Sequence, residues 1–434
     1  MLCANSRRGP TMPLLLYTGC FYLLLPLIVL RLCQRSLRAP AYRQRIAERF
    51  ACFTAPEIAA CRPVWVHAVS VGEVVAAVPM IRQLQEQNPS LPIVVTTMTP
   101  TGSERAQAML GDSVFHVYAP YDVPLLIRRF IRRLKPRLLI IMETEIWPNT
   151  ILICRREGVE VVLANARLSE KSARGYARLS SLTQQVFVAF SRIVVQTEAD
   201  AARFRELGAS GSQLVVGGSI KFDIQIKASL RQSAQAERVK LKAEKRPVWI
   251  CASTHEGEED IILSAFAAVL QQLPDALLVI APRHPERFKL VAAKVSAAGF
   301  GLVRRSQGGV PEGQPVLLLD TMGELLLLFG CADVATVGGS LIDRGGHNSL
   351  EPAAWGLPIV NGPSDFNFAE ISQLLQQSGA LTIAGSEAEL GRQVSELLAD
   401  EALCKQKGAA GFGVIEQNRG ALGRLLGVLS AYHR

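Results

Sequence analysis

Short apolar runs and longer stretches of helical periodicity alternate along most of the chain. In the first half, the apolar runs are Val64–Val69, Ile93–Thr97, Leu138–Met142, Val161–Ala164, Ile193–Gln196 and Leu214–Val216. Helical patterns such as Val74–Gln87 and Glu198–Leu207 fill the gaps between them. Because strands without a polar side must be covered on both faces, this alternation predicts a parallel sheet between two layers of helices.

The same alternation returns after a polar, charged interruption. This interruption, Lys227–Pro247, reads as an interdomain linker with some helix. We therefore predict two doubly wound α/β lobes, at residues 36–226 and 248–434, whose strand ends face a shared cleft. The last helix is a candidate to pack back on the first lobe. The strand-like runs of the second lobe are Val248–Ala252, Ala276–Ile280, Val316–Leu319, Val334–Val337 and Pro358–Val360.

The N-terminal segment has a different pattern. Thr11–Leu30 carries no charge over twenty positions, which is about the length needed to cross a bilayer. A cleaved signal peptide is the alternative, because Arg7 and Arg8 precede this run, but arginines rather than a small-residue cleavage site follow it. We predict an uncleaved anchor over residues 1–35 that crosses the membrane once and leaves both lobes on the arginine-rich, cytoplasmic side.

The positive charge of the chain is concentrated beside this anchor. Residues 1–50 contain eight Arg, no Lys and one acid, so they hold +7 of the formal +9. Arginine beside a membrane segment favours anionic lipid, and the near-neutral remainder argues against nucleic-acid binding. A second basic stretch, IRRFIRRLKPR at 127–137, predicts either a helix near lipid head groups or a solvated helix face.

The nine cysteines have irregular spacing, with no CxxC pair and no zinc-finger pattern. Several lie in apolar runs, where a free cysteine behaves as a small hydrophobic residue. These features indicate reduced thiols in a reducing compartment and no metal site.

In doubly wound folds the chemistry lies just after the strands, and the first lobe carries four candidate groups there. Glu73 stands at a predicted helix start, where it suits a general base or simply complements the helix dipole. Glu143 and Glu145 follow the strand Leu138–Met142, and alternation along a strand predicts that only one of them faces the cleft. Lys221, near the end of the lobe, is a phosphate ligand or an ordinary surface lysine.

Two loops of the second lobe offer further groups. Pro282 and Pro285 stiffen the loop that carries Arg283 and His284, and arginine is suited to gripping a phosphate in two places. Thr321–Glu324 follows another strand, where capping of the next helix is a sufficient explanation.

A glycine-rich turn joins a strand to a helix at Gly338–Glu351. Glycine lets backbone N–H groups approach a ligand closely, and a helix start favours an anion. Asn348 and Ser349 are good caps, and Glu351 is placed to accept hydrogen bonds from ribose hydroxyls. The spacing fits neither GxGxxG nor GxxxxGK[ST], so neither a dinucleotide fold nor a P-loop is supported. The turn therefore predicts a site for an anion such as the phosphate of a nucleotide, and a purely structural turn is the alternative.

Together these loops resemble the 3-deoxy-D-manno-octulosonic acid (Kdo) transferase family. The resemblance spans nearly the whole chain and rests on ordered motifs: SVGE at 70–73, METEIWPN at 142–149, NARLSEKS at 165–172, SIKFD at 219–223, PRHPERF at 282–288, MGEL at 322–325 and GGHNSLEP at 345–352. It implies a GT-B fold and an inverting glycosyltransferase that needs no metal or cofactor. It further implies transfer of Kdo from CMP-Kdo to the lipid A precursor, lipid IVA, in lipopolysaccharide biosynthesis at the inner membrane.

The resemblance also implies roles for individual residues. Glu73 matches the proton acceptor of the family, while Glu143 and Lys221 match positions that stabilise the transition state. The amides at 345–348 are expected to help Lys221 and Arg283 neutralise the departing phosphate. Ser349 departs from the residue common at that position, a difference that backbone contacts would survive. The expected CMP contacts are Pro282, Arg283, Met322, Gly323, Glu324, Asn348, Ser349, Leu350 and Glu351.

Two rival functions stay open at this point. The first is another GT-B transferase that uses a UDP sugar on a membrane lipid, which a comparison of CMP and UDP binding would separate. The second, from a different class, is a non-catalytic, membrane-tethered sensor of nucleotide sugars. Such a sensor would have little use for the carboxylates Glu73 and Glu143.

Overall fold

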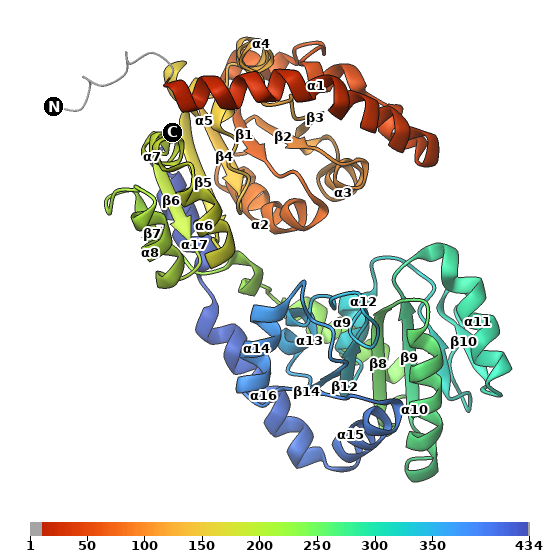
Figure 1. Cartoon of the computed structure of the whole chain (residues 1–434). Coiled ribbons are helices and arrows are strands. Elements are labelled where there is room, and N and C mark those ends of the chain that lie inside the picture. The colour runs from red at the N-terminus through yellow and green to blue at the C-terminus, as the bar shows by residue number, and fades with distance from the viewer. Residues whose placement is uncertain (1–10, 433–434) are drawn as a thin grey trace. The chain divides into compact units, whose positions relative to one another are not determined.

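The computed structural model describes residues 11–432, which form two compact units. Unit 1 consists of the residues up to Ile220 and the C-terminal segment from Arg419 onward. Unit 2 is Lys221–Asn418. Each unit contains one seven-stranded parallel sheet, and helices lie on both faces of each sheet (Figure 1). The predicted pair of doubly wound α/β units is confirmed. Residues 1–10 of the expected anchor lie outside the described part of the chain.

The sheet of unit 1 places its first strand in the middle. Its strands are β1 (Val64–His67), β2 (Ile93–Thr97), β3 (Phe115–Tyr118), β4 (Leu138–Met142), β5 (Glu160–Ala166), β6 (Arg192–Val195) and β7 (Leu214–Val216). The order across the sheet is β3-β2-β1-β4-β5-β6-β7. The chain therefore winds outward in both directions from β1 and β4, and ligands of such folds bind beyond the carboxyl ends of the two strands at this switch point.

Two layers of helices enclose this sheet. One face packs against the layer that contains Phe130, Phe187 and Phe204, and the other against the layer that contains Met80 and Leu425. The helices of unit 1 are α1 (Met12–Arg38), α2 (Val71–Gln87), α3 (Pro100–Leu110), α4 (Pro124–Leu134), α5 (Pro148–Arg156), α6 (Glu170–Ala177), α7 (Ser180–Ala189), α8 (Glu198–Glu206) and α17 (Ala421–Leu429). The last of these, α17, comes from the far end of the chain and packs beside α2.

Unit 2 repeats the same winding. Its strands are β8 (Val248–Thr254), β9 (Leu277–Pro282), β10 (Leu302–Arg304), β11 (Val316–Leu318), β12 (Val334–Val337), β13 (Ile359–Asn361) and β14 (Leu381–Ile383). Their order is β10-β11-β9-β8-β12-β13-β14, so the switch point lies between β8 and β12. The helices are α9 (Ala228–Lys240), α10 (Glu258–Gln272), α11 (Phe288–Ala297), α12 (Leu325–Phe329), α13 (Leu350–Trp355), α14 (Ala369–Gln377), α15 (Glu387–Ala399) and α16 (Glu401–Asn418).

Residues 227–247, predicted as an interdomain linker with some helix, belong to unit 2 in the structure. Most of the segment is helix α9, and Ala234 is buried in the core of unit 2 together with Leu241. Arg238 adds a 2.8 Å ion pair with Asp333, which precedes β12. The polar composition reflects the exposed side of this helix, whereas its small apolar side is covered.

Within residues 11–432, one helix is long and apolar enough to cross a membrane. This helix is α1, whose apolar stretch within Met12–Leu37 has a mean hydropathy of 2.1 and contains few fully buried residues. The uncharged run predicted a membrane helix here, and membrane association is the behaviour that this surface favours.

Candidate active site

Glu73 lies at the switch point of unit 1, in the first turn of α2 directly after β1. Its carboxylate is tied down at both oxygens: the hydroxyl of Ser70 donates to Oε1 at 2.7 Å, and the backbone N–H of Val69 donates to Oε2 at 2.9 Å. Ser70 in turn caps the helix by accepting from the N–H of Glu73. The side chain is buried, at 7% exposure, so the capping motif also holds a carboxylate in a nearly dry position.

Burial raises the pKa of Glu73 to about 7, against the lowering effect of its bonds to Ser70 and Val69. The negative charges of Glu145 and Glu143 raise it further. Both charges therefore act on the carboxyl group of Glu73. β4 ends at Met142, so both glutamates follow the strand, and that only one of them faces the cleft stays a prediction. A carboxylate with a pKa near neutrality is suited to accept a proton.

Three residues at the ends of central strands hold a left-handed backbone that is unusual outside glycine. Glu143 has φ 54°, Asn165 at the end of β5 has φ 55°, and Ser253 at the end of β8 has φ 58°. Such conformations cost about 1–3 kcal/mol each and collect at functional sites. The amide oxygen of Asn165 accepts from the N–H of Ile220 at 3.1 Å, which fixes the end of unit 1.

His67 is a buried group at this site that the motifs did not single out. It is the last residue of β1, and its Nδ1 lies 2.9 Å from the hydroxyl of Thr96. Burial lowers its pKa to about 3, so the ring is neutral at physiological pH. The ring of Trp147 meets it edge to face at 4.6 Å. His67 is therefore a neutral ring packed against Trp147 rather than a second charge.

Lys221 is the first residue of unit 2 and is half-buried. It lies in the short helical turn Ile220–Phe222, and the next side chain, Phe222, is buried in the core of unit 2. The backbone at Lys221 is therefore held in place by the buried side chain of Phe222.

The glycine-rich turn of unit 2 is organised by a carboxylate that sequence reading did not single out. Glu258, at the start of α10, is completely buried. It accepts from the backbone N–H groups of Gly339 at 2.8 Å, Leu341 at 3.0 Å and His255 at 2.9 Å. It thus joins the loops that follow β8 and β12, the two strands at the switch point.

Several amides of this turn are committed to the protein itself. The N–H of Gly345 donates to the hydroxyl of Ser364 at 2.8 Å, and the N–H of Gly346 donates to the carbonyl of Gly339 at 2.8 Å. The expectation that the amides at 345–348 point to an anion is therefore wrong for these two glycines. The physical reason is that a long loop must first satisfy its own buried N–H groups.

A histidine pair stands where the loops after β8 and β12 meet. The Nε2 atoms of His255 and His347 are 2.7 Å apart, so one ring donates and the other accepts. Burial lowers the pKa of both rings to about 4, and the nearby positive charges of Arg344 and Arg283 lower it further. The pair is therefore neutral at physiological pH and leaves the arginines as the positive charges of this region.

The predicted CMP contacts that precede the glycine-rich turn lie on two other strand-end loops. Pro282 ends β9, and the N–H of the half-buried Arg283 donates to the carbonyl of Thr254 at 3.0 Å. Met322 is 64% exposed, and Gly323 has φ 89°, which favours glycine. The carboxylate of Glu324 is already held by Arg305 at 2.6 Å, and this ion pair lowers its pKa.

The remaining predicted contacts start helix α13. The side chain of Asn348 accepts from the N–H of Leu350 at 3.1 Å, and Ser349 accepts from the amide of Asn361 at 3.1 Å. Leu350 is fully buried in the core, so only its backbone can reach a ligand. Glu351 lies in the first helical turn and is half-buried.

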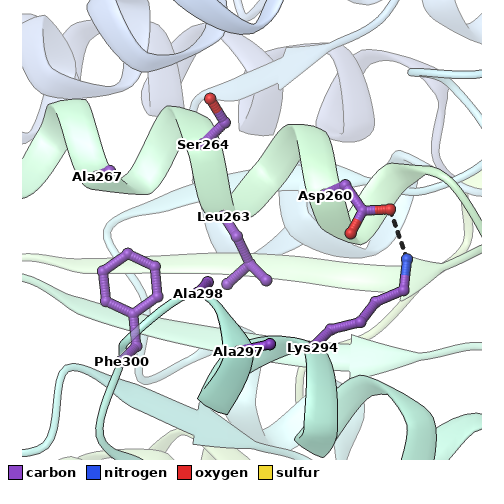
Figure 2. Close-up of a pocket in the computed structure, with 8 residues that line it drawn as sticks. All are labelled: Asp260, Leu263, Ser264, Ala267, Lys294, Ala297, Ala298 and Phe300. Atoms are coloured by element: carbon purple, nitrogen blue, oxygen red, sulfur yellow. Dashed lines mark hydrogen bonds and ion pairs between the residues drawn. The ribbon is translucent and has the colours of Figure 1, made fainter.

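Unit 2 has a groove of about 390 Å³ between α10 and α11. Figure 2 shows its lining, with the ion pair between Asp260 and Lys294 at one end and Phe300 at the other. Leu263 and the alanines at 267, 297 and 298 also line it. None of the lining residues is among the predicted contacts of the nucleotide. Among residues 11–432, no group of three or more His, Cys, Asp or Glu is arranged to hold a metal ion.

Replacing Gly338 by alanine should destabilise unit 2 by about 1–3 kcal/mol, the usual cost of overpacking. An added Cβ would lie 2.2 Å from the backbone carbonyl oxygen of Ser253, and backbone atoms cannot move aside as a flexible side chain can. Gly413 in α16 is the matched control, because nothing lies within 4 Å of its added Cβ, and alanine favours a helix. Urea unfolding of the two variants should separate them; equal midpoints would contradict this view of the turn.

The similarity to known proteins agrees with this geometry. The family described as 3-deoxy-D-manno-octulosonic-acid transferase (kdotransferase) matches residues 44–224. The chain is 42% identical to the 3-deoxy-D-manno-octulosonic acid transferase of Haemophilus influenzae, over 96% of this chain and 98% of that protein. It is 36% identical to the enzyme of that name from Bordetella pertussis, over 95% and 98% of the two chains. The chain belongs to this family.

The chain is therefore a Kdo transferase, and the resemblance found in its motifs is confirmed. Solved structures show that its fold is GT-B. A glycosyltransferase from Rickettsia africae is 12% identical with a TM-score of 0.55, over 86% of this chain and 98% of that one. The UDP-GlcNAc 2-epimerase from Neisseria meningitidis is 13% identical with a TM-score of 0.56, over 85% and 100%. At these identities the likeness concerns the fold alone.

Proposed function

We propose that the chain transfers Kdo from CMP-Kdo to a hydroxyl group of the lipid A precursor, lipid IVA, with inversion at the anomeric carbon. The observation that carries this proposal is the buried carboxylate of Glu73, which stands at the switch point of unit 1 with a pKa raised to about 7. A sugar hydroxyl is a weak nucleophile, so its attack needs a base at the moment of bond formation.

Glu73 takes the proton of the acceptor hydroxyl as its oxygen forms a bond to the anomeric carbon of Kdo. The bond from that carbon to the phosphate of CMP breaks, and CMP leaves with the electron pair. Glu143 is proposed to stabilise the positive charge that develops on the sugar, and its charge also keeps Glu73 basic. A single displacement of this kind inverts the configuration and, in this proposal, needs no metal.

Unit 2 is the proposed donor-binding unit. The leaving CMP is a phosphate monoester, so it needs positive charge rather than an acid to protonate it. Lys221 and Arg283 are proposed to supply that charge. The proposed contacts of the nucleotide are Pro282, Arg283, Met322, Gly323 and Glu324, together with Asn348 and Glu351 and the backbone of Ser349 and Leu350. The exposure of Met322 and the fixed start of α13 support this assignment.

Helix α1 is proposed to hold the enzyme at the cytoplasmic face of the inner membrane, where a lipid acceptor would be found. The exposed apolar surface of α1 and the arginines that follow it support this location. The reaction places the chain in lipopolysaccharide biosynthesis, because its proposed product is a lipid A precursor that carries Kdo.

The rate of Kdo transfer should depend on pH through Glu73. Below its pKa of about 7 the carboxyl is protonated and cannot accept a proton, so we expect kcat/KM to fall about tenfold for each pH unit below 7 and to level off above it. Initial rates between pH 5 and pH 9 with a fixed donor concentration test this. An acid limb with its midpoint near the ordinary glutamate pKa would contradict the assignment.

The donor and the stereochemistry can be tested together. Purified enzyme in detergent is given lipid IVA with either CMP-Kdo or UDP-N-acetylglucosamine, and the released nucleotide is measured. We expect CMP release from the first donor and no UDP release from the second. NMR of the isolated product should then show an anomeric configuration opposite to that of the donor; release of UDP, or retained configuration, would reject the proposal.

A further inference from the structure

One side of α1 is pressed lengthwise against unit 1. Leu14 is buried in the core of that unit, and Tyr17 packs beside it. Further along, Phe21, Leu25 and Ile28 pack against the segment that leads into α4. These residues recur at intervals of three and four, so they form one side of the helix. From Leu14 to Ile28 this contact covers about 21 Å of helix length, at about 1.5 Å per residue.

Two hydrogen bonds within this contact make it specific. The hydroxyl of Tyr17 donates to Oδ2 of Asp122 at 2.9 Å, and the hydroxyl of Thr18 donates to Oδ1 of Asn149 at 3.0 Å. Asp122 is itself buried and accepts from the N–H groups of Asn149 and Thr150 at the start of α5. The carboxylate of Asp122 therefore both holds α1 through Tyr17 and caps the start of α5.

The opposite side of α1 is apolar and uncovered. Its exposed fractions lie between 46% and 79% for Met12, Leu15, Leu16, Tyr22, Leu23, Leu24, Leu27 and Leu30. Arg31 and Arg35 follow, and both are exposed. The helix thus has one side that unit 1 occupies and one side that suits hydrocarbon, with positive charge at its end. Figure 1 shows α1, in red, running along the edge of unit 1.

A helix that crosses the bilayer would be surrounded by lipid over about 20 residues. In this chain those residues include Tyr17 and Thr18, so crossing with the contacts intact would carry Asp122 and Asn149 to the depth of the acyl chains. A buried carboxylate and irregular backbone at that depth are costly. Crossing without the contacts would expose the apolar side of unit 1 that α1 covers.

We propose that α1 does not cross the membrane but lies in the plane of the bilayer surface, with its Leu-rich side in the acyl chains and its Tyr17 side on unit 1. The occupant of the uncovered side is an anionic lipid bilayer. The apolar side supplies the hydrophobic contact, and Arg31 and Arg35 match the negative head groups. This orientation replaces the single crossing that the uncharged run alone predicts, and it concerns membrane attachment whatever the acceptor is.

Spin labels at Leu16, Leu23 and Leu30 test the orientation, because residues seven apart share one side of a helix. Each is changed to cysteine in a full-length chain in which Cys3, Cys20, Cys33, Cys52 and Cys61 are alanine. The chains are reconstituted into phosphatidylethanolamine–phosphatidylglycerol vesicles, and immersion depth is measured from collisions with oxygen and a nickel complex. We expect three similar depths of about 5–10 Å. A label at position 23 near the bilayer centre, with 16 and 30 shallow, would overturn the proposal.

Kdo transfer by the same labelled chains keeps the two proposals apart. A depth profile centred on position 23 in active enzyme would reject the in-plane helix and leave the reaction untouched. Three similar depths in enzyme without transfer activity would support the in-plane helix and reject the proposed reaction.

The contact of α1 with unit 1 has its own test. Tyr17→Phe removes the hydroxyl that donates to Asp122, whereas Tyr22→Phe makes the same change on the lipid-facing side. In vesicles, hydrogen exchange at the start of α5 should become faster in Tyr17→Phe and stay unchanged in Tyr22→Phe. Equal exchange in both variants would mean that α1 leaves unit 1 in the membrane, which contradicts the proposal.

Discussion

Replacing Glu73 by glutamine should lower the turnover of Kdo transfer by about 10²–10⁴-fold, the usual contribution of a general base. Glutamine keeps the shape of the side chain and is the normal alternative to glutamate in this capping motif. The helix start and the fold should therefore survive, and the unfolding temperature should stay close to that of the wild type. What is lost is the ability to accept a proton, so the rate should also lose its dependence on pH near 7.

The chain contains a matched control for this substitution. Glu389 occupies the same motif at the start of α15, where Ser386 caps the helix and the N–H of Gly385 donates to Glu389 at 2.8 Å. Glu73 is buried, whereas Glu389 is partly exposed. Glu389→Gln should leave transfer unchanged. If Glu73→Gln also transfers Kdo at near-normal rates, then Glu73 only caps its helix, and the assignment of the base is wrong.

Replacing Glu258 by alanine should destabilise unit 2 by about 3 kcal/mol and weaken CMP binding. Three backbone N–H groups would lose their acceptor, at about 1–3 kcal/mol for each buried group. Burial raises the pKa of Glu258, so removing a desolvated carboxylate offsets part of this loss. Because the three amides belong to the loops after β8 and β12, the proposed nucleotide site should lose its shape before the unit unfolds.

Glu256→Ala is the control for Glu258, two residues earlier in the same loop. Its side chain is 77% exposed, and its ion pair with Arg287 spans 3.5 Å, so we expect a change below about 0.5 kcal/mol. Urea unfolding and calorimetric titration with CMP measure both effects. Normal CMP affinity in Glu258→Ala at a temperature where it is folded would show that the turn does not depend on this carboxylate.

The central strands could be predicted from the sequence, but three strands at the edges of the sheets could not. β3, β10 and β14 end the sheet order on one side or the other. Their burial is incomplete, with only two buried residues in β3, none in β10 and one in β14. A strand that is covered on fewer sides needs no continuous apolar run, and FHVY or LVR therefore gives no clear signal.

In the candidate site, residues whose partners are close in the sequence could be predicted, whereas residues whose partners are far away in the sequence could not. Glu73 could be found because its motif is local, spanning only Ser70 to Glu73. Glu258 could not, because an acid in the first turn of a helix is ordinary. Its partners Gly339 and Leu341 are 81 and 83 positions away in the chain. The pairing of His255 with His347 across 92 positions has the same origin.

Residues 227–247 and the glycine-rich turn show what composition leaves out. Polar composition predicts a linker with some helix at residues 227–247, and the amides at 345–348 are expected to face an anion. In the structure, α9 covers part of the core of unit 2 with one small apolar side. Likewise, the N–H groups of Gly345 and Gly346 donate to the hydroxyl of Ser364 and the carbonyl of Gly339. Composition shows which side chains and N–H groups a segment contains, whereas the fold determines which of them are already buried or hydrogen-bonded within the protein.

The most direct test of the proposed reaction is mass spectrometry of lipid IVA after incubation with CMP-Kdo and purified enzyme, with wild type, Glu73→Gln and Glu389→Gln compared at pH 8. We expect the acceptor to gain Kdo, with matching release of CMP, in the wild type and in Glu389→Gln. Glu73→Gln should leave the acceptor almost unchanged over the same time. An acceptor that gains no Kdo from the wild-type enzyme, or gains it equally from Glu73→Gln, would contradict the proposed function.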